Sequence, residues 1–146
     1  MSDKHLTLEL VTPEKVAWSA PADFVVLPAL NGEMGVFPGH QSFLVQLSAG
    51  EVRVTSGADV KHFAVSGGFA EIKNDTVSLF AETAEDAGQI DSERAHQALE
   101  KAKAVLKPGL DPMQLMAMEA AIRRAQVRVR VSRRSHGSTP PPHVGQ

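Results

Sequence analysis

The hydrophobic pattern of this 146-residue chain changes its period once, and this change is the strongest constraint on the fold. Near the start, Leu6, Leu8 and Leu10 alternate with polar residues, and a period of two is typical of a half-buried β-strand. From about residue 91 the apolar residues recur every three or four positions, which is the period of an amphipathic helix. The sequence therefore predicts a β domain followed by a helical domain.

Several short strand-like segments follow one another in the first part of the chain, without a helical pattern between them. They cover residues 6–10, 24–27, 51–55, 60–65, 69–73 and 76–82. Asn74 and Asp75 favour a hairpin turn between the last two segments. Ser66 is interpreted as part of a tight turn between strands and not as a nucleophile, because the Gly-x-Ser-x-Gly pattern is missing around it. This succession predicts an antiparallel β-sandwich or barrel.

Two helices are expected after the strands. The first has Asp91 as its N-cap and stops at Lys107-Pro108-Gly109, and the second has Asp111 as its N-cap and Pro112 at its first position. The spacings predict an antiparallel helical hairpin. The seam of the second helix consists of Leu115, Met118, Ile122, Ala125 and Val129.

The end of the second helix is ambiguous in the sequence. Val127–Val131 fits a strand as well as a helix end, and the residues from Ser132 onward, with Pro140–Pro142, have nothing to bury and are expected to be disordered. The predicted organisation is thus a β-sandwich domain over residues 1–87, a helical hairpin over residues 88–131 and a disordered tail over residues 132–146.

Charge is distributed unevenly along the chain. All 17 acidic residues and nine of the 15 Lys and Arg residues lie before residue 120, which gives that part a net charge of −8. Residues 120–146 contain six arginines and no acidic residue, a net charge of +6. A basic end on an acidic body predicts an anionic partner. The candidates are an acidic protein surface, a nucleotide and, less favoured, nucleic acid.

Several functional classes are not supported by the sequence. The chain has no cysteine, so it has neither disulfides nor a thiolate zinc site, and its six histidines lack metal-ligand spacing. No nucleophile, base and orienting group can be assembled, so we expect no enzymatic activity of its own and no metal site. No run reaches the roughly 20 apolar residues of a membrane span, and neither a signal peptide nor a transit peptide is expected.

One cluster of charged residues has two interpretations. Asp91 and Arg94 lie at the start of the first predicted helix, and Arg124 and Arg128 share one face of the second. In an antiparallel hairpin Arg94 and Arg128 approach each other. Converging guanidinium groups can bind phosphate oxygens, but an N-cap and a solvated face with exposed ion pairs explain the same pattern.

The stretch 26–40 carries Gly32, Gly35 and Gly39 with Pro28 and Pro38 between apolar runs, and has no catalytic set. Glycine and proline at these positions require defined turns, which favours a docking surface over a reacting one.

Five segments in order make the chain resemble the epsilon subunit family of F-type ATP synthase over about residues 5–131. They are Val11–Glu14, Gly32–His40, Val65–Glu71, Ala81–Glu85 and Ile90–Ala95. The family fold is a β-sandwich of about ten strands followed by a helical hairpin, which agrees with the change of period.

The resemblance implies a non-catalytic rotor subunit that couples proton translocation to ATP synthesis. It implies that the sandwich binds the gamma subunit and the c-ring, with Glu33 and His40 contacting the c-ring from a turn over residues 31–40. It also implies that the hairpin inhibits ATP hydrolysis by binding the alpha and beta subunits. The arginines expected at that contact are Arg123, Arg124, Arg128 and Arg130. The implied location is the cytoplasmic side of the bacterial inner membrane, where the protein is peripheral and attached through the complex.

Some bacterial members of this family bind ATP at the folded hairpin as a regulatory ligand. Their pattern maps onto Glu85, Ile90, Asp91, Arg94, Ala95, Arg124 and Arg128, and Lys101 stands at a position that can be arginine in the family. The alternative function from a different class is an independent nucleotide- or nucleic-acid-binding module that uses the C-terminal arginines.

Overall fold

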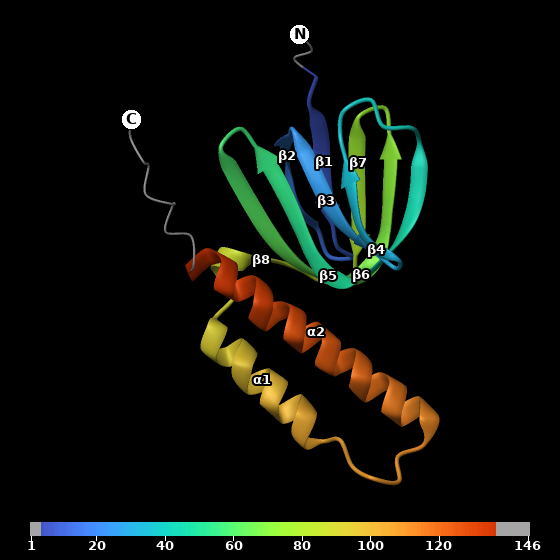
Figure 1. Ribbon diagram of the computed structural model, residues 1–146, viewed down its shortest axis with the longest axis vertical. Coiled ribbons are helices and arrows are strands. Elements are labelled where there is room, and N and C mark those ends of the chain that lie inside the picture. Colours follow the sequence, from blue (N-terminus) through green and yellow to red (C-terminus); the bar gives the residue numbers. More distant parts are fainter. Residues whose placement is uncertain (1–3, 137–146) are drawn as a thin grey trace. The chain divides into compact units, whose positions relative to one another are not determined.

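The computed structural model describes residues 4–136, and within them the chain forms two compact units. The first unit extends to Asp86 and is built of strands, and the second begins at Ala87 and is built of helices (Figure 1). The change from strand to helix thus lies where the hydrophobic period changes, and each unit has its own architecture.

The first unit is a β-sandwich of eight strands. These are β1 (Leu6–Val11), β2 (Val16–Ala22), β3 (Phe24–Ala29), β4 (Gly32–Val36), β5 (Phe43–Ser56), β6 (Asp59–Lys73), β7 (Thr76–Ala81) and β8 (Ala84–Asp86). They follow the order β2-β1-β7-β6-β5-β3-β4, with β8 paired to β6. All pairs are antiparallel except β1 with β7, which run parallel.

The two longest strands hold the sandwich together. β5 and β6 pair from Phe43 opposite Ile72 to Ser56 opposite Asp59, so one hairpin contributes to both layers. The second half of β5 pairs with β3, whereas the second half of β6 pairs with β7. Leucine and valine side chains from both layers form one buried cluster, in which Leu8, Leu27 and Leu79 have no exposed surface.

The prediction of a tight turn at Ser66 is wrong. β6 continues without interruption through Ser66, and the chain bends there because Gly67 and Gly68 adopt φ values of 109° and 133°. The Ser66 amide donates to the Thr83 carbonyl, and the Ser66 Oγ accepts from the Thr83 amide at 3.0 Å. The segments 60–65 and 69–73, expected as separate strands, are continuous in β6, and the described residues contain eight strands and not about ten.

The second unit is a helical hairpin. It consists of a 3₁₀ turn η1 (Ala87–Gln89), helix α1 (Ser92–Ala104) and helix α2 (Pro112–His136). Both predicted N-caps are confirmed. The Asp91 Oδ1 accepts from the amides of Glu93 and Arg94 at 3.0 and 3.1 Å.

The cap of α2 is reciprocal. The Asp111 Oδ1 accepts from the Gln114 amide at 2.9 Å, while the Gln114 Oε1 accepts from the Asp111 amide at 3.3 Å. This is a capping box, which satisfies two backbone donors at once. Pro112 follows the cap at the first helical position, as expected.

The prediction for the end of the chain needs correction. α2 continues through Val127–Val131 and on to His136, so Ser132–His136 is helical and not part of a disordered tail. The physical reason is that no glycine or proline occurs between Pro112 and Gly137, and the modest preference of valine for strands does not end a helix. Residues 137–146 of the predicted tail lie outside the described residues.

The hairpin is packed unequally along its length. Ala95 and Leu99 of α1 and Ala125 and Val129 of α2 are buried, and the Ser92 hydroxyl donates to the hydroxyl of the fully buried Ser132 at 3.2 Å. At the other end of the predicted seam, Leu115 is 38% exposed, and Met113 beside it is 82% exposed. The helices are therefore held together mainly near the start of α1.

We predict that Gly68→Ala destabilises the sandwich more than Gly32→Ala does. Both glycines have φ above 120°, so both substitutions introduce backbone strain of about 1–3 kcal/mol. Only at Gly68 would the new Cβ also collide with the Phe80 carbonyl oxygen, whereas nothing lies within 4 Å at Gly32. Overpacking of this kind costs about 1–3 kcal/mol more. Equal losses of unfolding free energy in urea would contradict this assignment of the bend.

Candidate functional site

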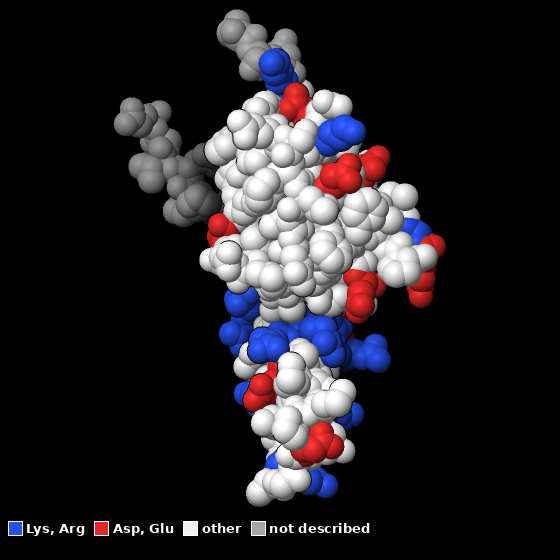
Figure 2. Space-filling model, turned by 90° about the vertical axis from the view of Figure 1, so that its right-hand side faces the viewer, with Lys and Arg blue, Asp and Glu red and all other residues white. Residues whose placement is uncertain are grey.

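Basic side chains gather on the helical unit (Figure 2). On α2, Arg123, Arg130 and Arg134 are seven and eleven positions apart, so they share one face of the helix, and all three are exposed. Arg124 is also exposed but lies on a different face, together with Arg128. The four arginines predicted to contact the alpha and beta subunits are therefore divided between two faces of α2.

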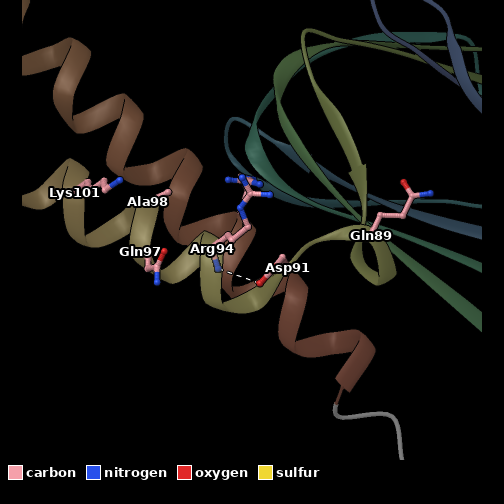
Figure 3. Close-up of a pocket in the computed structure, with 7 residues that line it drawn as sticks. Gln89, Asp91, Arg94, Gln97, Ala98 and Lys101 are labelled. Atoms are coloured by element: carbon pink, nitrogen blue, oxygen red, sulfur yellow. Dashed lines mark hydrogen bonds between the residues drawn. The ribbon is translucent and has the colours of Figure 1, made fainter.

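A pocket of about 570 Å³ opens between α1 and α2 (Figure 3). Its lining residues are Gln89, Asp91, Arg94, Gln97, Ala98, Lys101 and Arg128. Arg94, Ala98 and Lys101 follow one another at helical spacing along one face of α1, and Arg128 comes from α2. The small side chain of Ala98 leaves space between the two longer cationic ones.

The charge of this pocket is predominantly positive. Three cationic side chains line it beside one carboxylate, that of Asp91. The Oδ1 of Asp91 already accepts two backbone hydrogen bonds as the cap of α1, which compensates part of its charge. In the described part of the chain, Arg94 and Lys101 form no ion pair. The pocket can therefore attract an anion.

The structure brings together three of the seven residues predicted for ATP, namely Asp91, Arg94 and Arg128. Ile90 and Ala95 are 4% and 0% exposed and contribute as buried packing residues. Arg124 is exposed and does not line the pocket. Glu85 belongs to β8 of the other unit, where it is paired with Ala64 of β6.

Sequence reasoning missed three lining residues, Gln89, Gln97 and Ala98. Gln97 and Ala98 lie three and four positions after Arg94 on α1, so helical periodicity from Arg94 would have found both. Gln89 lies in η1, and nothing in its sequence context distinguishes it.

The segment 31–40 is not the single turn that the sequence analysis expected. β4 occupies its centre, with a turn at Leu30–Asn31 on one side and a loop with Pro38 and Gly39 on the other. The amide of Gly39 donates to the Asp75 Oδ1 at 2.6 Å, which ties this loop to the turn between β6 and β7. A Cβ at Gly35 of β4 would lie 3.0 Å from the Phe24 ring, so a larger residue there would have to displace this ring.

Glu33 and His40, the predicted c-ring contacts, have different environments. Arg53 donates to both carboxylate oxygens of Glu33, at 2.8 and 3.3 Å, and this hydrogen bonding raises the pKa of Arg53. Arg53 also donates to the buried Glu51 at 3.4 Å. The His40 Nδ1 bonds to the Gln41 carbonyl at 2.7 Å in the loop. Glu33 is thus part of an ion-pair network on the sheet, while His40 belongs to an exposed loop.

The sequence analysis also missed an apolar groove on the sandwich. Phe69 and Phe80 face each other across β6 and β7 and are 51% and 49% exposed. Val11 of β1 lies beside Phe80, and these residues line a groove of about 340 Å³ together with Thr12, Pro13, Gly68, Ala81 and Glu82. We call this surface the sandwich groove. Part of this groove could have been predicted from the sequence. Phe69 alternates with the core residues Ala70 and Ile72, so its side chain is expected to point outward.

Two further observations concern the described residues as a whole. No helix among them is long and apolar enough to cross a membrane. Within residues 4–136, histidine and acidic side chains form no group of three that could hold a metal ion.

Comparisons with known proteins give consistent results for both units. Residues 5–87 match the family described as the beta-sandwich domain of the ATP synthase delta/epsilon chain. The ATP synthase epsilon chain of Syntrophobacter fumaroxidans is 40% identical over 135 residues, covering 92% of this chain and all of the relative. That of Citrifermentans bemidjiense is 42% identical over 134 residues, covering 90% and 96%.

A solved structure agrees with these sequence matches. A chain in the mitochondrial ATP synthase of Euglena gracilis, from the part that comprises OSCP, F1 and the c-ring, superposes with a TM-score of 0.72. It is 26% identical, and the superposition covers 86% of this chain and 82% of the other.

We predict that Arg53→Gln lowers the free energy of unfolding more than Glu33→Gln does. Losing Arg53 leaves the buried Glu51 carboxylate without one of its donors, which costs about 1–3 kcal/mol. Losing Glu33 removes only an exposed partner, and exposed pairs contribute less than about 1 kcal/mol. Urea unfolding of both variants measures the difference, and the opposite order would contradict the role assigned to Arg53.

Proposed function

The chain belongs to the ATP synthase delta/epsilon family, and we propose that it is a rotor subunit of the central stalk, coupling proton translocation to ATP synthesis without an active site of its own. The observation that carries this proposal is the match of about 40% identity to epsilon chains over both units. It is the first of the two functions that the sequence suggested, and the match to epsilon chains covers the helices as well as the sandwich.

The sandwich groove supports binding to the gamma subunit. Two half-exposed phenylalanines that face each other across a sheet are typical of an interface core, because aromatic side chains contribute large apolar areas at little entropic cost. We assign the groove to gamma, and the loop that contains His40 to the c-ring. Glu33 accepts hydrogen bonds from Arg53, and we assign it a weaker contact with the c-ring.

The exposed arginines of α2 support an inhibitory contact with the alpha and beta subunits. Arg123 and Arg130 present positive charge on one face, and an acidic surface would complement it. Through this complex we place the protein peripherally on the cytoplasmic side of a bacterial inner membrane. The relatives named above that share about 40% identity are bacterial chains.

The cationic pocket of the hairpin supports binding of the phosphates of ATP. We assign Arg94, Lys101 and Arg128 to this role, with ATP as a regulatory ligand and not a substrate. A ligand that binds only the closed hairpin stabilises it by about 2.7 kcal/mol at 100 times its dissociation constant. This is enough to shift a nearly balanced conformational equilibrium.

We predict that Phe69→Ser and Phe80→Ser each weaken binding of the purified gamma subunit by at least about tenfold, because an interface aromatic contributes about 2 kcal/mol or more. Phe43→Ser is the matched control, since Phe43 is also half exposed but does not line the groove. Calorimetric titration of gamma measures the affinities. If the wild-type chain does not bind gamma, the rotor function itself is wrong. If the wild-type chain and both groove variants bind gamma equally well, the assignment of the groove to gamma is wrong.

We predict that truncation after Ala87 raises ATP hydrolysis by the assembled enzyme and leaves its coupling intact, because the sandwich is retained and the inhibitory helices are lost. The double variant Arg123→Gln, Arg130→Gln should raise hydrolysis part of the way, since it removes charge and keeps both helices. The double variant Lys103→Gln, Lys107→Gln is the charge-matched control. Unchanged hydrolysis after truncation would exclude inhibition by the hairpin.

A further inference from the structure

Methionine is concentrated in one short segment of the chain. Three of the five methionines are Met113, Met116 and Met118, which lie within six consecutive positions at the start of α2 (Figure 1). The chain contains no cysteine, so no thiol of its own competes with these thioethers for an oxidant. The start of α2 is therefore the part of the chain that is richest in oxidisable sulfur.

Two of these side chains are far more exposed than the other described methionines. Met113 is 82% exposed and Met116 is 69% exposed. Met118 is only partly exposed, and Met34 packs against the core cluster of the sandwich. Because an oxidant has to reach the sulfur atom, we expect a peroxide to react with Met113 and Met116 first.

The reaction at each thioether needs only a peroxide. The sulfur lone pair attacks one oxygen of hydrogen peroxide, so that an S–O bond forms while the O–O bond breaks. The released hydroxide takes the proton of the transferred hydroxyl group and becomes water, so the sulfur is oxidised by two electrons and the peroxide is reduced. The product is methionine sulfoxide, a polar side chain that methionine sulfoxide reductases convert back to methionine.

The fold tolerates this change because neither side chain supports it. Met113 and Met116 lie in the first two turns of α2, where Asp111 and Gln114 form the capping box without them. The buried contacts of the hairpin lie at its other end, near the start of α1. A polar group on two exposed side chains should therefore leave the free energy of unfolding almost unchanged.

The same side chains extend the face of α2 to which we assign the inhibitory contact. Met116 lies seven positions before Arg123, and Arg130 lies seven positions after it, so all three share one face of the helix. Met113 is the neighbour of Met116 on the preceding turn. An exposed apolar patch that continues a basic face is typical of an interface, where flexible methionine side chains adapt to the surface of the partner.

We propose that Met113 and Met116 form a peroxide-sensitive modification site, and that their conversion to sulfoxides weakens the inhibitory contact of α2. This inference rests on the proposed inhibition of ATP hydrolysis by the hairpin. Apolar side chains stabilise such a contact by leaving water, whereas a sulfoxide oxygen loses hydrogen bonds to water when it is buried there. Oxidation should thus raise hydrolysis without unfolding either unit.

Treatment of the full chain with hydrogen peroxide tests the modification site, with mass spectrometry of its peptides at successive times. We expect Met113 and Met116 each to gain one oxygen at least about fivefold faster than Met34. Equal rates would overturn the site. Circular dichroism of the oxidised chain should match that of the untreated chain, and a loss of helix would overturn the inference, because the change would then act through the fold.

Reconstitution of the enzyme tests the regulatory effect. The chain is oxidised alone, freed of peroxide and added in excess to an ATP synthase depleted of this subunit, so that no other subunit is oxidised. We expect ATP hydrolysis to be at least about twofold faster than with the untreated chain. Methionine sulfoxide reductases should restore the inhibition. An unchanged rate would overturn the regulatory role.

Two leucine variants locate the effect. The double variant Met113→Leu, Met116→Leu keeps both side chains apolar, so after peroxide treatment it should inhibit as the untreated chain does. Met118→Leu is the matched control and should lose inhibition after peroxide treatment, as the wild-type chain does. Loss of inhibition by the treated double variant would overturn the proposal.

The truncation after Ala87 separates this inference from the proposed function. If that truncation does not raise hydrolysis, inhibition by the hairpin is itself wrong, and the effect of oxidation on it is wrong as well. The relative oxidation rates of Met113, Met116 and Met34 would still decide whether the modification site exists.

Discussion

The sandwich depends on one continuous hairpin, β5 with β6, that contributes to both of its layers. The bend of β6 at Gly67 and Gly68 makes this possible, since the strand can change direction there without losing its pairing. The same bend lies at the sandwich groove, because Gly68 is one of its lining residues and Phe69 follows it directly. The backbone conformation that joins the layers therefore also shapes the surface assigned to the gamma subunit.

In the helical unit, Asp91 links the fold to the pocket. Its carboxylate begins α1 by capping two amides, and this places Arg94, Ala98 and Lys101 in register along one face of the helix. The capping role explains why an acidic residue is tolerated in a pocket of cations, because its charge lies at the positive end of the helix dipole. It also limits what this residue can offer to a ligand.

Much of the fold could be predicted from local patterns, while the site could be predicted only in part. The alternation at Leu6–Leu10 and the caps Asp91 and Asp111 are local features, and the structure confirms them. The sequence predicts a turn at Ser66–Gly68 where the structure has a bend within β6, because two adjacent glycines permit both and only pairing with distant strands distinguishes them. Periodicity predicts that Phe69 points outward, but the sandwich groove also depends on Phe80 and Val11 becoming its neighbours, which periodicity does not reveal.

The unequal packing of the hairpin determines where a bound anion has its effect. Buried contacts and the Ser92–Ser132 hydrogen bond hold the helices together near the start of α1, whereas Met113 and Leu115 remain exposed at the other end. Three cations meet in the pocket beside the packed end, so closing the hairpin brings like charges together and costs energy that a bound anion offsets. Because the exposed end has few buried contacts to lose, opening should begin there and reach the pocket last. A ligand bound as proposed in this pocket would therefore act on the final step of opening, in which Arg128 separates from Arg94 and Lys101.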